Sequence, residues 1–217
     1  GNFERGTTVL HVDQPLEAFA ALKETDPLVL RDRLASARER LLAARPHRVR
    51  PHRDDKILTS WNGLMIAALA YGGATLEEPR YLLAARRAAD FILTALARDG
   101  ALLRRYRAGD ARYGGTLEDY AFCLHGLIEL YEVDFDPRWL AEAKRLAAEM
   151  TGRFWDPEAG GFFLRSRDEP PLLVRSKELY DGATPSGGSL AVDGLLRLGR
   201  LTGDLELETL GRRALER

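Results

Sequence analysis

A repeated pair of helices is the feature that most constrains the fold of this chain. The segment EPRYL at 78–82 recurs 58 residues later as DPRWL at 136–140. Each copy follows one apolar helical pattern and opens another, and a third unit fits at a step of 68 residues. One helical hairpin cannot bury its own apolar face, so repeats of this size are typical of stacked hairpins. The sequence therefore predicts an all-α array of helical hairpins.

Prolines and glycines indicate where the helices begin and end. Pro27, Pro79 and Pro137 fall near helix starts, where a missing N–H costs nothing, and each follows an acidic residue that suits the positive end of the helix dipole. Gly100 and Gly152 mark two helix ends. The expected helices lie at about 15–24, 27–45, 56–71, 79–98, 117–133, 137–153, 187–202 and 204–217.

The repeat also predicts how the helices are layered. We expect the first helix of each unit, at 56–71, 117–133 and 187–202, to form an inner layer covered by the second helices. Short extended stretches beside turns are expected to form small β-hairpins in the loops. One begins at 101–105, before a turn at 109–110, and the other consists of 161–165 and 172–175 around a turn at 168–171.

Composition argues against several classes of function. The 32 basic residues are matched by 33 acidic ones, so no electrostatic case exists for nucleic acid or an anionic membrane as a partner. The longest nearly apolar run, at 64–74, is about half of the roughly 20 residues that a membrane helix needs. The single Cys123 excludes an internal disulfide, and we expect it to lie in the core. The histidines and aspartates at 47–55 match no standard metal-ligand spacing, so we expect no metal. We also expect no cofactor and a cytoplasmic location.

The candidate functional residues lie where loops meet the first helix of each unit. Trp61, Tyr120 and Tyr180 stand beside acids and amides, a combination that offers a sugar an aromatic plane for its C–H face and acceptors for its hydroxyls. Asp119 and Asp181 are the candidate acid and base. The further candidate substrate-binding residues are Asp54, Asp55, Asn62, Glu118, Glu178 and Ser186.

Several of these residues have a structural alternative. Asp119 stands at a helix start and fits a cap, Asp181 fits a turn, and Trp61 fits a core position. Gly63 inside a helical pattern costs about 1 kcal/mol relative to alanine, which indicates a close helix approach or a ligand. His125 falls opposite an alanine of the preceding unit, so we expect a core or lining residue rather than a catalyst.

Three segments in order resemble a known family. KILTSWNGLMI at 56–66, LEDYA at 117–121 and YDGATPS at 180–186 are similar to segments that mark the thioredoxin-domain-containing spermatogenesis-associated proteins. The resemblance implies a C-terminal (α/α)6 toroid related to N-acylglucosamine 2-epimerases and six-hairpin glycosidases, joined to an N-terminal thioredoxin-like domain. In related toroids the pocket lies at the mouth of the ring, lined by the N-terminal ends of the inner helices.

We therefore expect residues 1–217 to form a single segment of a partial (α/α)6 toroid, as an incomplete part of a larger protein. Its partners would be a small-molecule ligand such as a sugar, the thioredoxin-like domain and the remaining hairpins. Two functions remain open. The first is a carbohydrate-active enzyme of the epimerase or glycoside hydrolase type, in which Trp61, Asp119 and Asp181 converge on one cavity. The second is a noncatalytic toroid that binds a ligand or protein and serves as a scaffold for a redox domain.

Overall fold

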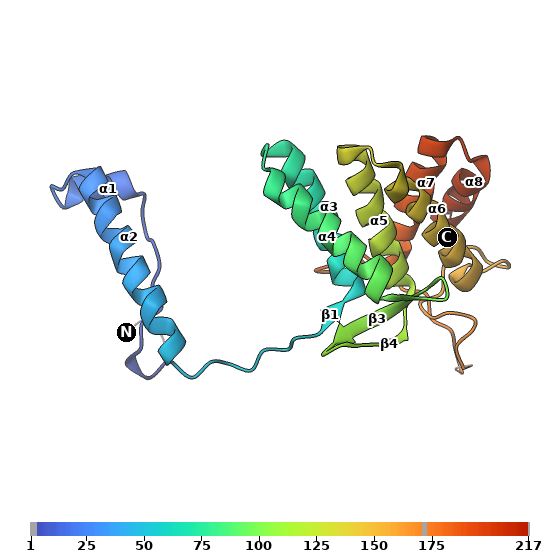
Figure 1. Cartoon of the computed structure of the whole chain (residues 1–217), viewed down its shortest axis with the longest axis horizontal. Helices are drawn as coiled ribbons and strands as arrows, with labels where there is room; N and C mark the ends of the chain where they lie inside the picture. Colours follow the sequence, from blue (N-terminus) through green and yellow to red (C-terminus); the bar gives the residue numbers. More distant parts are fainter. Residues whose placement is uncertain (1–3, 171–172, 217) are drawn as a thin grey trace. The chain divides into compact units, whose positions relative to one another are not determined.

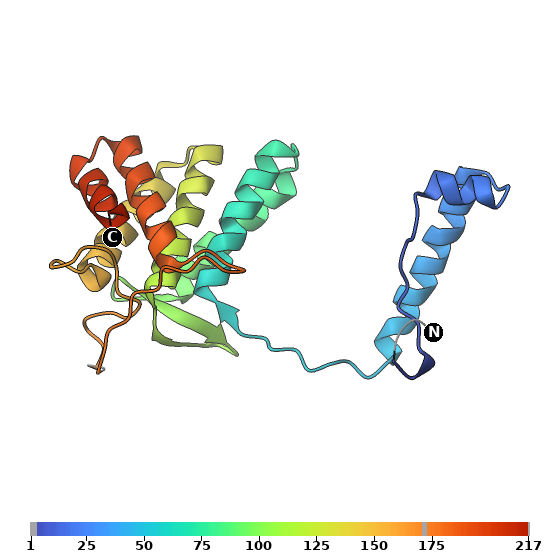
Figure 2. The same ribbon diagram turned by 180° about the vertical axis from the view of Figure 1, so that it is seen from behind.

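The computed structural model describes residues 4–170 and 173–216, and the chain divides into two compact units, Gly1–Asp54 and Asp55–Arg217 (Figures 1 and 2). The repeated hairpins all belong to the second unit, whereas the sequence analysis predicts a single toroid segment over residues 1–217. The stretch 45–53 before the boundary is rich in proline and arginine and offers no apolar face, which fits a boundary between units.

The first unit is a small pair of helices. The carboxylate of Asp26 accepts the N–H of Leu28 at 2.7 Å and so caps the second helix, as its Asp-Pro start predicts. Of its described residues only Ala20 is fully buried. The elements of this unit are η1 (Glu4–Gly6), α1 (Leu16–Leu22), α2 (Pro27–Ala44) and η2 (Arg45–His47).

The second unit consists of three helical hairpins and a small sheet. Helix α5 packs against both α3 and α7, whereas α4, α6 and α8 each pack mainly on the helix that precedes them, as Figures 1 and 2 show. This arrangement confirms the partial toroid and its inner layer of α3, α5 and α7. The helices are α3 (Thr59–Thr75), α4 (Pro79–Ala95), α5 (Leu117–Asp134), α6 (Pro137–Phe154), α7 (Gly187–Thr202) and α8 (Leu205–Leu215).

Small residues allow the inner helices to lie close together. A Cβ on Gly63 would lie 2.4 Å from the backbone carbon of Phe122, and one on Gly126 would lie 2.6 Å from the carbonyl oxygen of Gly63. The expected close approach at Gly63 is thus confirmed. Cys123 is 3% exposed in the same interface, so its place in the core is confirmed too. Across the described ranges, no helix is both long and apolar enough to span a bilayer.

A four-stranded antiparallel sheet adjoins the starts of the inner helices. The strands are β1 (Ile57–Leu58), β2 (Ala97–Arg98), β3 (Ala101–Arg107) and β4 (Asp110–Gly114). Strand β3 pairs with each of the other three, and its register places Arg105 opposite Leu58 on one side and Arg112 on the other. The hairpin expected at 101–105 is confirmed.

The second expected hairpin, formed by 161–165 and 172–175 around a turn at 168–171, is wrong within the described residues. At 161–165 a single bridge joins Phe162 to Trp155, and residues 173–175 hold no strand, while Leu172 lies outside the described residues. The backbone there bonds to other loops instead: the N–H of Leu164 donates to the carbonyl of Ser176 at 2.9 Å. Extended segments whose polar groups find loop partners do not need a ladder.

Candidate functional site

The N-terminal ends of α3, α5 and α7 lie side by side. The backbone N–H of Ser60 donates to Oδ1 of Asp119 at 3.0 Å, which ties the start of α3 to the start of α5. A Cβ on Gly187 would lie 3.1 Å from the backbone nitrogen of Glu118, so α7 begins against α5. We call these three first turns, residues 59–62, 117–120 and 187–190, the mouth. Three helix dipoles present their positive ends here.

Asp119 is the buried hub of the mouth. It is 1% exposed, and besides the Ser60 bond its Oδ2 accepts the backbone N–H of Thr116 at 2.8 Å and the Thr116 hydroxyl at 3.1 Å. Burial raises the pKa of this carboxyl, while these hydrogen bonds and the charge of Arg104 oppose the rise. Both carboxylate oxygens accept hydrogen bonds from the protein, which is the geometry of a helix cap, the structural alternative that the sequence offered for Asp119. The catalytic role of Asp119 stays a prediction.

Asp181 stands before the start of α7 and is exposed. Its carboxylate accepts the backbone N–H of Ser186 at 2.7 Å and the hydroxyl of Ser189 at 3.1 Å, and these bonds lower its pKa. The hydroxyl of Ser186 in turn accepts the N–H of Ser189 at 3.1 Å, so Ser186 caps α7. Asp181 and Ser186 therefore organise a helix start, while the carboxylate stays open to solvent and ionised.

Glu118 is the half-buried carboxyl of the mouth. Its pKa is raised mainly by burial, then by the negative charges of Glu178 and Asp119, and Arg104 partly offsets this. A carboxyl whose pKa moves toward neutrality retains its proton longer, which is what a general acid requires. The sequence assigned Glu118 and Glu178 to binding alone, because nothing local to either residue reveals that they lie near one another.

The candidate aromatic and amide residues differ in their surroundings. Trp61 is 65% exposed on the first turn of α3, which excludes the core alternative, and Tyr180 is 81% exposed. Tyr120 is instead buried in the core at 1% exposure, where its hydroxyl accepts the N–H of Leu102 at 2.9 Å and anchors β3 to α5. The Asn62 amide donates to the carbonyl of Leu58 and so stabilises the start of α3.

Of the two aspartates before β1, Asp55 belongs to the second unit. Asp55 pairs with Nε of Arg107 at 2.5 Å on the sheet. Asp54 is the last residue of the first unit, and its role in binding stays a prediction. Among the residues that the structure describes, no group of three or more His, Cys, Asp or Glu side chains is arranged to hold a metal ion.

A polar cluster on α5 and α7 was missed by the sequence interpretation. His125 lines a hollow of about 370 Å³ with Glu129 and Tyr71, which agrees with the expectation of a core or lining residue. Its Nδ1 lies 3.7 Å from Oδ2 of Asp193, and this buried nitrogen has no hydrogen-bond partner in the described part of the chain. Arg197 pairs with Glu129 at 2.7 Å. Helical spacing of four between His125 and Glu129 was the available signal.

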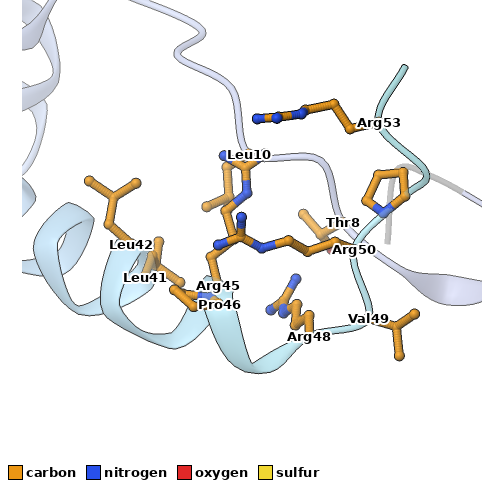
Figure 3. Close-up of a pocket in the computed structure, with 11 residues that line it drawn as sticks. Thr8, Leu10, Leu41, Leu42, Arg45, Pro46, Arg48, Val49, Arg50 and Arg53 are labelled. Carbon is orange, nitrogen blue, oxygen red and sulfur yellow. The ribbon is translucent and has the colours of Figure 1, made fainter. Parts of the chain in front are cut away.

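A second hollow, of about 930 Å³, is lined by residues of the first unit. Apolar side chains of α2, among them Leu41 and Leu42, lie near the arginines 45, 48, 50 and 53 (Figure 3). None of the candidate site residues lines this hollow.

Trp61, Asp119 and Asp181 belong to or adjoin neighbouring first turns, but their convergence on one cavity stays a prediction.

Comparison with known proteins identifies relatives of the chain. No protein-family model matches it. It is 38% identical over 213 residues to human spermatogenesis-associated protein 20 and 37% identical over 212 residues to the mouse protein. These matches cover 92% and 91% of this chain but 27% and 26% of the relatives, so the chain spans about a quarter of their length. The resemblance found from the three segments is confirmed.

Solved structures of low sequence identity share the fold. Cellobiose 2-epimerase from Spirochaeta thermophila superposes with a TM-score of 0.61 at 17% identity, covering 74% of this chain and 42% of that one. Unsaturated glucuronyl hydrolase from Bacillus sp. GL1 superposes with a TM-score of 0.60 at 16% identity, covering 77% and 48%. These likenesses establish the helical-hairpin toroid as the fold class.

Proposed function

We propose that this chain, a homologue of a segment of spermatogenesis-associated protein 20, forms part of a toroid that binds a sugar at its mouth and acts on it as an epimerase or glycoside hydrolase. One observation carries the proposal. The first turns of α3 and α5 are joined by the bond from Ser60 to Asp119, and these turns carry the exposed indole of Trp61 and the carboxyl of Glu118, whose pKa is raised. An indole face accepts sugar C–H groups, and a carboxyl that retains its proton supplies an acid.

The proposal gives the acids different chemical roles. Glu118 is the proton donor in this proposal, because it is half-buried and its pKa is raised. Asp181 is the base, since its lowered pKa keeps it ionised and it is exposed. Asp119, the acid suggested by the sequence, becomes a positioning residue, because both of its oxygens accept bonds from helix starts.

Trp61 and Tyr180 provide the aromatic surfaces for the sugar, and Asn62 and Ser186 stabilise the starts of α3 and α7. The solved toroids named above include proteins described as a cellobiose 2-epimerase and a glucuronyl hydrolase, which supports sugar chemistry for this chain. A fold hosts many reactions, so the proposal depends on the residues of the mouth.

The scaffold function is the second candidate, and a specific observation favours it. The carboxylates of Asp119 and Asp181 both accept hydrogen bonds from groups at helix starts, and Tyr120 lies in the core. These three residues would behave in the same way in a toroid that performs no chemistry.

The deciding experiment is a ligand screen of the intact protein with mono- and disaccharides, read by thermal shift and then by calorimetry. A ligand at 100 times its dissociation constant adds about 2.7 kcal/mol to the stability of the protein. Binding that Trp61→Ala abolishes, with turnover that Glu118→Gln and Asp181→Asn abolish, supports the enzyme. Sugar binding without any turnover supports a ligand-binding toroid. The absence of binding for every sugar contradicts the proposal and favours the scaffold.

A further inference from the structure

A groove beside the mouth is lined mainly by cationic side chains, which make up four of its six lining residues. It has a volume of about 360 Å³ and lies on the sheet, between β1, β3 and β4. No acidic side chain is among its lining residues, which are Lys56, Leu58, Arg104, Arg105, Arg107 and Tyr113.

The carboxylates around the groove engage two of its arginines but not the third. Arg107 pairs with Asp55, and Arg105 lies 3.8 Å from Asp110 with its guanidinium over the ring of Tyr113. Arg104 donates to the hydroxyl of Thr116 at 3.2 Å, and within residues 4–170 and 173–216 it forms no ion pair. An exposed guanidinium fork without an ion-pair partner suits a planar anionic group.

The groove adjoins two of the helix starts that form the mouth. Leu58 lines the groove and is the N-cap residue of α3, three positions before Trp61. Thr116, which accepts the bond from Arg104, is the N-cap residue of α5. The sheet therefore brings the cationic groove to the starts of two inner helices.

Charge is divided across this end of the molecule. The side at α3 and the sheet carries Arg104 and its cationic neighbours, and the side at α5 and α7 carries Glu118 with Glu178 nearby. Arg104 is close enough to lower the pKa of Glu118, so the two sides face a common region. A ligand there would be oriented, with an anionic end toward the arginines and hydroxyls toward the carboxyls.

We infer that the groove binds the carboxylate or phosphate of an acidic sugar and so selects anionic over neutral sugars at the mouth. This inference rests on the proposed function and names its substrate class. Arg104 holds the anionic group through its guanidinium fork, Arg105 is fixed over Tyr113 as the second cation, and the sugar ring lies toward Trp61. A volume of about 360 Å³ is large enough for one acidic sugar unit.

The experiment compares matched ligands on the intact protein by titration calorimetry. Glucuronate and glucose 6-phosphate are the acidic probes, glucose is the neutral probe, and inorganic phosphate is the anion without a sugar. We expect the acidic sugars to bind at least about tenfold more tightly than glucose. Arg104→Gln should remove this preference, because it should weaken the binding of the acidic sugars much more than the binding of glucose. Arg112→Gln is the matched control, because Arg112 lies on the same hairpin, pairs with Asp110 and does not line the groove.

The outcomes separate the groove from the proposed function. Equal affinity for glucuronate and glucose overturns the groove and leaves the sugar-binding mouth standing. Failure of all the sugars contradicts both. Inorganic phosphate that binds as tightly as glucose 6-phosphate overturns the acidic-sugar assignment, because the anion alone would then account for binding. If Arg104→Gln does not fold, the salt dependence of the wild-type preference decides: it should shrink at high salt, and a preference that salt leaves unchanged contradicts the groove.

Discussion

The Asp119 carboxylate accepts the backbone N–H of Ser60 at 3.0 Å, although the two residues are 59 positions apart in the sequence. One buried side chain thus joins the first turns of two inner helices. Because the same carboxylate also accepts the N–H of Thr116, it sets the distance between the turn that carries Trp61 and the turn that carries Glu118. The arrangement of the mouth therefore depends on a residue that solvent barely reaches.

Asp119→Asn should lower the free energy of unfolding by about 1–3 kcal/mol, because the new amide group would place an N–H donor against the donor of either Ser60 or Thr116. Urea denaturation of the wild type and the variant measures the difference. The neighbouring Glu118→Gln is the control and should not be destabilised, because within residues 4–170 and 173–216 no backbone group bonds to the Glu118 side chain. A variant as stable as the wild type would show that the Asp119 bonds contribute little.

Glu118→Gln should raise the melting temperature at neutral pH. Burial and the charge of Glu178 raise the pKa of Glu118 in the folded state, so the folded protein binds this proton more tightly than the unfolded chain does. The stabilising contribution is complete below the ordinary value of 4.5 and is lost as the pH rises through the raised folded pKa. Melting curves from about pH 4 to pH 8 should show this loss in the wild type and not in the variant. Parallel curves would refute the shift.

Gly63→Ala should destabilise the protein by about 1–3 kcal/mol or more, because the added Cβ would lie 2.4 Å from the backbone of Phe122 and force α3 and α5 apart. Gly152→Ala is the matched control. Gly152 lies within α6 with no atom within 4 Å of an added Cβ, so alanine should stabilise by about 0.5–1 kcal/mol. Thermal unfolding of both variants tests the pair, and effects of equal sign would contradict the close helix approach.

Trp61→Ala should weaken sugar binding by about tenfold or more while leaving the melting temperature nearly unchanged, because the side chain is 65% exposed and contributes little to the core. Calorimetry and thermal unfolding measure the two effects separately. Leu83→Ala, which truncates a side chain 54% exposed on the outer helix α4, controls for loss of surface apolar area. Unchanged sugar affinity in Trp61→Ala would remove the aromatic platform from the proposed site.

The Cys123 thiol should be inert in the folded protein. Burial raises its pKa, and the side chain is 3% exposed between α3 and α5, so neither thiolate nor access is provided. A colorimetric disulfide reagent should label the native protein no faster than the interface of α3 and α5 opens. It should label the protein unfolded in urea at once. Rapid labelling under native conditions would mean that the interface of α3 and α5 opens easily.

Several elements could be predicted because their causes are local. Helix α6 was expected at 137–153 and runs over Pro137–Phe154, since Asp136 and Pro137 define its start within the sequence itself. Helix α3 begins later than expected, at Thr59, because Ile57 and Leu58 pair with β3 instead. That pairing joins residues far apart in the chain, and no local pattern reports it.

The sequence by itself determined the repeat, the hairpins and the segments that form the mouth, because hydrophobic period, proline and capping residues act over a few positions. It left open whether Asp119 is a cap or a catalyst, and it placed Tyr120 among the binding residues. Only the tertiary structure decided that Asp119 bonds to Ser60 and that Tyr120 lies in the core. It also brought Arg104 to the start of α5. Burial and long-range hydrogen bonds arise when helices pack, so these properties belong to the packed molecule and not to any one segment.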